Sequence, residues 1–155
     1  MLFSFDRNDG LDPCSGVVSD RSGRFYGTTN QGGSSSCGET TCGTVFRLTK
    51  GPDGRWKETV LYDFPEPANG SNPTSGVTFD KAGSLYGTAG GGSSSCSGGC
   101  GVVYQLTPTV TGKWKYTLLH KFTGQDGGYP AGGVVLDGTG NLYGTAYNVV
   151  YKITP

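Results

Sequence analysis

The stretch DKAGSLYGT, residues 80–88, decides the fold because the chain carries it three times. Near-copies read DRSGRFYGT at residues 20–28 and DGTGNLYGT at residues 137–145, at offsets of 60 and 57 residues. Such self-similarity is the signature of a repeat architecture, in which each copy is one supersecondary unit. In every copy an Asp and a Gly frame a tight turn, since Asp bonds the turn backbone and Gly accepts a positive φ. The sequence therefore predicts three copies of one unit.

Three further blocks of sequence recur around this stretch. They lie at residues 13–20, 73–80 and 130–137; at 43–49, 101–107 and 149–154; and at 56–64 and 114–122. All are short runs of β-branched and aromatic residues separated by Gly, Pro, Asn and Asp, which is the pattern of strands joined by tight connections. We therefore predict an all-β fold of β-propeller blades, with three four-stranded antiparallel repeats per chain.

The chain is expected to form a single repeat domain, residues 1–155, with repeats at approximately 1–59, 60–117 and 118–155. Met1–Phe5 aligns with Val60–Phe64, so this N-terminal strand is expected to close the third repeat, which lacks its own fourth strand. Three blades are fewer than the usual minimum of about four. We therefore expect a two-chain ring, an open polymer, or a piece of a longer propeller.

Composition excludes several protein classes. Glycine and proline make up 37 of the 155 residues, which argues against a long-helix protein. Twelve basic residues balance twelve acidic ones, so we expect neither nucleic acid nor an anionic membrane surface as a partner. No apolar run approaches the roughly 20 residues that cross a bilayer. No signal-peptide pattern is present either. The alternatives are a cytosolic protein or, as the paired cysteines favour, a secreted or cell-surface protein whose signal segment is absent from this sequence.

The motifs resemble those of one known family. The turn D-x-x-G-x-(L/F)-Y-G-T, the Gly-rich stretch after it and the block G-x-V-(F/Y)-x-L-T are similar to the bacterial GloVer tandem-repeat family, often labelled choice-of-anchor proteins. The resemblance covers essentially all 155 residues. Residues 80–86 and 137–143 also resemble the turns of NHL-type propellers. The resemblance implies an extracellular β-propeller, surface-anchored in longer relatives, with no catalytic residues to carry over. The short connection at residues 146–148 departs from the long one of the other repeats.

Four of the five cysteines fall into pairs within the same connection of successive repeats. The pairs are Cys37 with Cys42 and Cys96 with Cys100. A loop-closing disulfide in each is the simplest interpretation; the alternative is a shared four-cysteine zinc site, for which CxxC spacing is more usual. Cys14 aligns with Thr74 and Ala131, so we expect a buried small residue, or else a cysteine that pairs between chains.

Residues that could carry catalysis have simpler structural interpretations. His120, the only histidine, aligns with the aromatic residues Tyr62 and Phe3, which predicts a packing ring, and no G-x-S-x-G setting is present. A glycosidase would need two opposed acids. The repeated acids are turn residues instead, namely Asp20, Asp80 and Asp137. We therefore predict no enzyme activity, no catalytic residues and no cofactor.

Two further features could bind a ligand. The segment 6–12 is superficially similar to a calcium loop, but its spacing is one residue off and its twelfth position is Val17 instead of Glu, so a polar turn without metal is predicted. Trp56 and Trp114 could stack on sugars; we expect them to cover the outer edge of a blade instead. The Tyr-Gly-Thr triplets are expected in the core or between blades.

Alternation of strand direction places the long connections on one face. Loops on a rigid scaffold are where binding is usually built. The candidate ligand-binding residues there are Asp6, Asn8, Asp9, Asp12, Asn69, Asn72, Gln125 and Asp126. The resulting expectation is a non-enzymatic extracellular module for surface structure or adhesion that assembles through its blade faces as a homo-oligomer. A lectin-like glycan-binding propeller is the alternative, and a carbohydrate-active enzyme comes third.

Overall fold

The fold is all-β, as predicted, and consists of three antiparallel sheets of four, four and three strands. The computed structural model describes residues 1–34, 36–37, 40–65, 67–92, 96–97 and 99–155, without the side chains of 36, 37, 40, 41 and 67. The first sheet holds β1 (Val18–Ser19), β2 (Phe25–Thr29), β5 (Thr44–Lys50) and β6 (Trp56–Asp63). The second holds β7 (Thr78–Phe79), β8 (Leu85–Ala89), β9 (Val102–Pro108) and β10 (Trp114–Lys121). The third holds β11 (Val135–Leu136), β12 (Leu142–Ala146) and β13 (Val149–Ile153).

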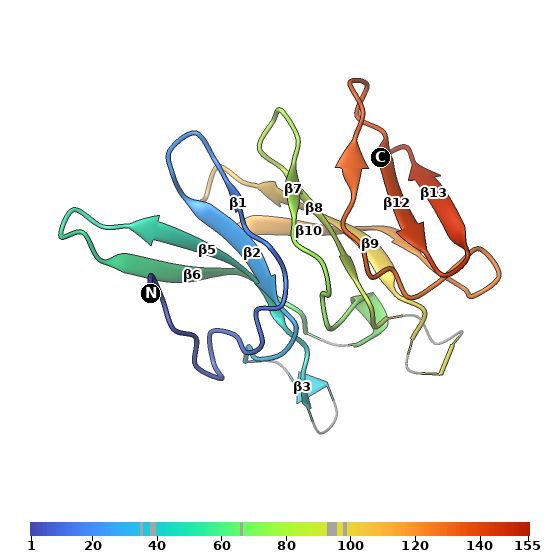
Figure 1. Ribbon diagram of the computed structural model, residues 1–155, viewed down its shortest axis with the longest axis horizontal. Coiled ribbons are helices and arrows are strands. Elements are labelled where there is room, and N and C mark those ends of the chain that lie inside the picture. Colours follow the sequence, from blue (N-terminus) through green and yellow to red (C-terminus); the bar gives the residue numbers. More distant parts are fainter. Residues whose placement is uncertain (35, 38–39, 66, 93–95, 98) are drawn as a thin grey trace.

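Two small elements lie in the connections. The strands β3 (Ser36–Cys37) and β4 (Thr40–Thr41) form a two-stranded ribbon, and η1 (Pro67–Asn69) is a single 3-10 turn. Within each large sheet the strands follow one another in chain order, and the three sheets lie side by side from the blue to the red end of the chain (Figure 1). The short turns between β1 and β2, β7 and β8, and β11 and β12 lie at the upper end of this view. The long connections lie at the lower end, where the candidate ligand face was predicted.

The glycine of each Tyr-Gly-Thr triplet is dictated by a ring on the neighbouring strand. Gly87 is paired with Tyr104 across the β8–β9 ladder, and a Cβ at Gly87 would lie 2.5 Å from the Tyr104 hydroxyl oxygen. The same arrangement recurs for Gly144 with Tyr151. A side chain at these positions would displace a ring from the interior, so close approach explains the repeated glycine.

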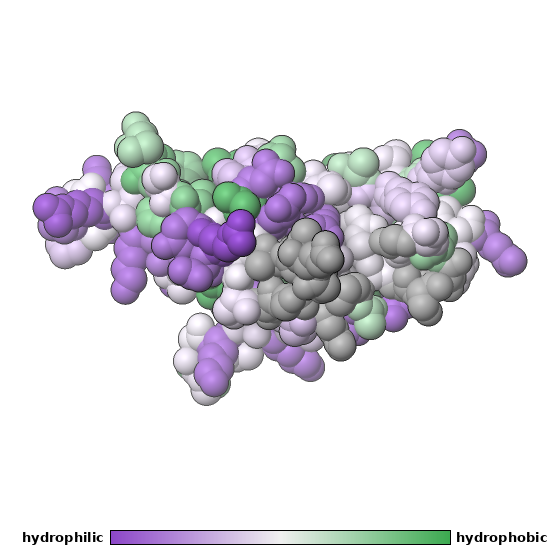
Figure 2. Space-filling view, turned by 90° about the horizontal axis from the view of Figure 1, so that it is seen from below, coloured by the Kyte–Doolittle hydropathy of each residue, from purple (hydrophilic) through white to green (hydrophobic). Residues whose placement is uncertain are grey.

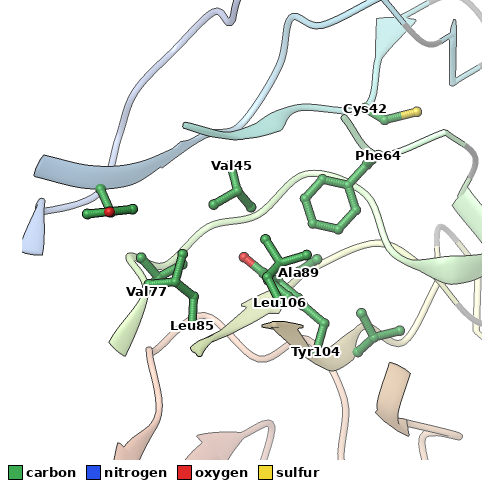
Figure 3. Close-up of a cluster of buried hydrophobic side chains, with 10 residues drawn as sticks. Cys42, Val45, Phe64, Val77, Leu85, Ala89, Tyr104 and Leu106 are labelled. Carbon is green, nitrogen blue, oxygen red and sulfur yellow. The ribbon is translucent and has the colours of Figure 1, made fainter. Parts of the chain in front are cut away.

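Aromatic and branched side chains join neighbouring sheets into a continuous core. Figure 3 shows Val45 of β5 and Phe64, which directly follows β6, lying over Leu106 and Tyr104 of the second sheet. The Phe64 and Tyr104 rings meet edge-on with centroids 5.3 Å apart. A second buried cluster joins the second sheet to the third. The triplet tyrosines Tyr26 and Tyr86 are buried in these clusters.

The expected N-terminal strand does not form. Met1–Phe5 adopts no strand, and Phe5 packs on Phe46 of β5, with ring centroids 4.8 Å apart. The third sheet keeps three strands, and the expectation that the N-terminal strand closes it within the same chain is wrong. The physical reason is distance: the three sheets form a row, and β13 lies at the opposite end of it from the N-terminal segment, which therefore cannot pair with β13 (Figure 1). No helix among the described residues is long and apolar enough to cross a membrane.

Candidate functional site

At each end of the row, one sheet has an exposed face. Inside the row, a neighbouring sheet covers the equivalent face. We define the trailing face as the exposed side of the third sheet, formed by Val135, Tyr143, Thr145, Val150 and Lys152. Val45, Val103 and Val150 occupy equivalent positions in the three repeats, and their exposed fractions are 0, 0 and 80%. The next sheet covers the first two, whereas no described residue covers the third.

The opposite end shows the complementary pattern. We define the leading face as the side of the first sheet that carries Val17, Phe25, Trp56 and Glu58. Val17 is 53% exposed, whereas its equivalents Val77 and Val134 are each 2% exposed because the preceding sheet lies against them. Phe25 and Trp56 pack on one another, with ring centroids 5.3 Å apart. The leading and trailing faces are therefore the two halves of an interface that occurs twice inside the chain.

Hydrogen bonds across the internal interfaces repeat as well. The Thr28 hydroxyl donates to the Ser75 carbonyl at 2.8 Å, and the equivalent Thr88 hydroxyl donates to the Gly132 carbonyl at 3.0 Å. The third equivalent, Thr145, lies on the trailing face, and its hydroxyl makes no such bond within the described part of the chain. The trailing face thus carries an unused hydrogen-bond donor at the position from which the other two repeats donate to the next sheet.

The leading face carries the carboxyl group of Glu58 in surroundings that disfavour its ionised form. Burial raises the pKa of Glu58 to about 7, and the nearby charge of Asp9 adds to the effect. The Glu58 Oε1 atom is buried and makes no hydrogen bond to the residues that the structure describes. The Lys152 ammonium group on the trailing face lies 5.8 Å from the centroid of the Tyr143 ring.

The predicted ligand residues near the N-terminus are engaged in a local turn. Asp6 Oδ1 accepts the amides of Asn8 at 2.7 Å and Asp9 at 3.3 Å, and Asp9 Oδ1 accepts the amide of Asp6 at 2.8 Å. Asp12 has a φ of 61°, and its carbonyl accepts the amide of Asn30 at 3.0 Å. The segment is a polar turn, and no group of three or more potential metal ligands occurs among the described residues.

The other predicted ligand residues lie in the corresponding connections. Asn72 has a φ of 55° and donates through Nδ2 to the Asn30 carbonyl at 3.1 Å. The Asn69 carbonyl accepts the Tyr116 hydroxyl. Gln125 is exposed, as is Asp126. Figure 2 views this lower end, where most of the visible surface is hydrophilic to neutral and hydrophobic residues gather at the upper left.

His120 and Asp126 form a contact that the sequence did not reveal. His120 Nε2 lies 3.0 Å from Asp126 Oδ2, and the His120 ring packs edge-on against Phe122 at 4.7 Å between centroids. Hydrogen bonds, first from the Thr123 amide, hold the pKa of the exposed Asp126 below its usual value. The histidine is a packing ring, as expected, that also has a carboxylate neighbour.

The described cysteines include one disulfide and one free thiol. Cys96 and Cys100, which lie four residues apart in the sequence, form a disulfide within the connection between β8 and β9. The predicted Cys37–Cys42 bond involves the Cys37 side chain, which lies outside the described residues. Cys14 is free and exposed, so the expectation of a buried residue is wrong; its equivalents Thr74 and Ala131 are exposed as well, so this position faces solvent in all three repeats.

The repeated acids hold the turns together. Asp137 accepts the amides of Thr139 and Asn141, each at 2.9 Å, and the Tyr143 hydroxyl at 3.1 Å. Hydrogen bonds, first from the Asn141 side chain and then from Thr139, hold the pKa of Asp137 well below its usual value. Asp20 and Asp80 make the same kinds of bonds. These acids therefore occupy structural positions, as predicted.

A cavity of about 750 Å³ opens between the first and second sheets, at the end away from the long connections. The first sheet contributes Tyr26, Arg24 and Arg47, and the second contributes Phe79 and Trp114. Two turns complete the rim, with Asp20, Arg21 and Ser22 on one side and Asp80, Lys81 and Ala82 on the other. Sequence reasoning missed this site because its residues come from different repeats. The only signal was the pair of basic residues at positions where the second repeat carries Ser84 and Gln105.

Comparison with known proteins identifies the repeat. The Gloeobacter/Verrucomicrobia repeat family matches residues 1–155, the whole of the chain. No curated protein matches it. The chain belongs to the Gloeobacter/Verrucomicrobia repeat family, in agreement with the resemblance of its motifs.

Proposed function

We propose that this member of the Gloeobacter/Verrucomicrobia repeat family is a non-enzymatic β-propeller module that assembles with copies of itself by placing the trailing face of one chain on the leading face of the next. In this proposal each sheet is one blade, and the assembly is either a two-chain ring or an open polymer. The disulfide between Cys96 and Cys100 supports an oxidising, extracellular location, in which such an assembly would serve surface structure or adhesion.

The observation that carries the proposal is the exposure of Val150 and Val17 beside their buried equivalents. Burying one valine side chain contributes roughly 1.5–3 kcal/mol, so two uncovered valines on matching faces favour association. The interface is heterologous, since two different faces meet, and it closes into a ring or continues as a filament according to the rotation between copies. The unused Thr145 donor fits the same arrangement.

Light scattering coupled to size exclusion, over a dilution series, tests the assembly. The chain has a mass of 16.1 kDa, so a two-chain ring gives about 32 kDa and a polymer gives larger species. Val150→Glu and Val17→Glu should each yield a monomer, because each buries an unpaired charge in one half of the interface. Val110→Glu is the matched control, since Val110 is fully exposed in the turn between β9 and β10.

Two results would overturn the proposal. A wild-type chain that stays monomeric at every concentration would show that the end faces do not bind one another. An assembly that survives both Glu substitutions would show that association uses another surface. Runs with and without reductant separate this association from a bond through the exposed Cys14.

A further inference from the structure

We propose that the cavity between the first two sheets binds an acidic saccharide, with the sugar ring against Trp114 and the anionic group at Arg47. The proposal goes beyond the assembly described above, because Val17 and Val150 do not line the cavity. The volume of about 750 Å³ lies within the range of small-molecule sites, roughly 300–1,000 Å³.

The charges around the cavity favour a negatively charged ligand. Four basic side chains line it, namely Arg21, Arg24, Arg47 and Lys81. Only Arg24 has an ion-pair partner within the described part of the chain, where its Nε lies 2.5 Å from Asp20 Oδ2. The remaining three cations face a cavity shared with two carboxylates, so an anionic group is favoured there.

Arg47 provides the most specific anchor. Its Nε atom is buried and makes no hydrogen bond to any described residue. Arg47 also lines the cavity without an ion-pair partner among the described residues, and a guanidinium matches a carboxylate or a sulfate with two parallel hydrogen bonds. The equivalent residue in the second repeat, Gln105, is satisfied by a 2.8 Å hydrogen bond to the Tyr86 hydroxyl. The unsatisfied donor is thus particular to the first interface.

The remaining lining residues fit a sugar ring. Trp114 and Phe79 provide aromatic surface, and the buried Tyr26 ring lies behind them, 5.0 Å from Phe79 and 6.3 Å from Trp114 between centroids. Asp80 Oδ2 accepts the Tyr86 hydroxyl and keeps a second lone pair, which can accept a hydrogen bond from a sugar hydroxyl. A uronate carboxylate and a sulfate ester offer the same anionic chemistry, so both belong to the proposed class.

Calorimetric titration at about 50 mM salt, where screening is modest, tests the proposal. The probes are trigalacturonate, a heparin-derived hexasaccharide, neutral cellotriose and inorganic sulfate. Binding of one or both acidic saccharides, with cellotriose and sulfate at least about tenfold weaker, is expected; the two acidic probes distinguish a uronate from a sulfate ester. Arg47→Gln installs the residue that the second repeat carries, and it should weaken binding by about tenfold or more.

Matched variants separate this site from general charge and from folding. Trp114→Leu should weaken binding about as much as Arg47→Gln, whereas its repeat equivalent Trp56→Leu should not. Lys57→Gln removes an exposed cation of β6 outside the cavity and should leave affinity unchanged. Unchanged unfolding midpoints establish that the variants are folded. The proposal fails if neither acidic probe binds, if cellotriose or sulfate binds equally well, or if Lys57→Gln costs as much affinity as Arg47→Gln. Any of these outcomes leaves the assembly proposal intact, since that proposal rests on mass measurements of other variants.

Discussion

The hydroxyl of Tyr86 donates a hydrogen bond of 3.0 Å to Oδ2 of Asp80, six residues earlier in the chain. The other oxygen of Asp80 accepts the amides of Ala82 and Ser84, each at 2.8 Å. One carboxylate therefore ties the turn between β7 and β8 to the buried ring of the strand that follows. The same contact occurs in the first and third repeats.

Asp80→Ala should destabilise the chain by about 2–3 kcal/mol, because it leaves two turn amides and a phenol without their acceptor. Tyr86→Phe removes only the hydroxyl and should cost about 1 kcal/mol. Chemical denaturation measures both free energies of unfolding. Equal losses for the two variants would contradict the view that the turn amides carry most of the effect.

Gly87→Ala should be among the most damaging single-methyl changes. The added Cβ would overlap the Tyr104 ring, so we expect a loss of about 2–4 kcal/mol or failure to fold. Gly83→Ala provides a contrast, since no heavy atom lies within 4 Å of that Cβ position and only the cost of a φ of 89° applies. Thermal unfolding of both variants tests this order, and a milder effect at Gly87 than at Gly83 would refute it.

Tyr104→Phe should leave stability unchanged or raise it by about 1 kcal/mol. The Tyr104 hydroxyl is buried without a hydrogen bond to any described residue, and burial raises the pKa of this phenol. The first repeat already carries Phe46 at the equivalent position. Removing an unsatisfied polar group while keeping the ring is favourable. A clear loss of stability in a urea unfolding measurement would show instead that the Tyr104 hydroxyl makes a stabilising hydrogen bond.

Glu58→Gln should stabilise the chain at neutral and alkaline pH. The folded pKa of about 7 lies above the ordinary value of 4.5, so the folded state binds more protons than the unfolded state between these values. Stability therefore falls as pH rises from about 4.5 to 7, by up to about 3 kcal/mol. The variant removes this fall. Unfolding free energies at pH 5 and pH 8 measure it, and the same pH slope in wild type and variant would contradict the assignment.

Phe122→Ala should cost about 3–5 kcal/mol, because Phe122 is fully buried and its ring packs on Tyr151 at 5.2 Å between centroids. Phe5→Ala removes the equivalent ring at the open end of the row, where Phe5 is only half-buried, and should cost distinctly less. Denaturant unfolding of the two variants compares an internal junction with a terminal one. Equal losses would mean that Phe5 is covered by something other than its own chain.

The sequence predicted the strands and turns because their signals are local. Asp80, Gly83 and the Tyr-Gly-Thr triplet lie within nine residues, and each repeat supplies an independent copy of the pattern. Non-local features escaped prediction. Met1–Phe5 has the composition of a strand, yet its partner strand would lie at the other end of the row. Arg47 and Trp114 each look ordinary in their own repeats, and only the packing of two sheets brings them to one cavity.

The paired contacts Phe64–Tyr104 and Phe122–Tyr151 make each junction between sheets nearly the same. A duplication or deletion of one unit of about 60 residues would therefore join two surfaces that already fit, without any new interface having to evolve. Recombination could therefore change the length of the chain in whole units.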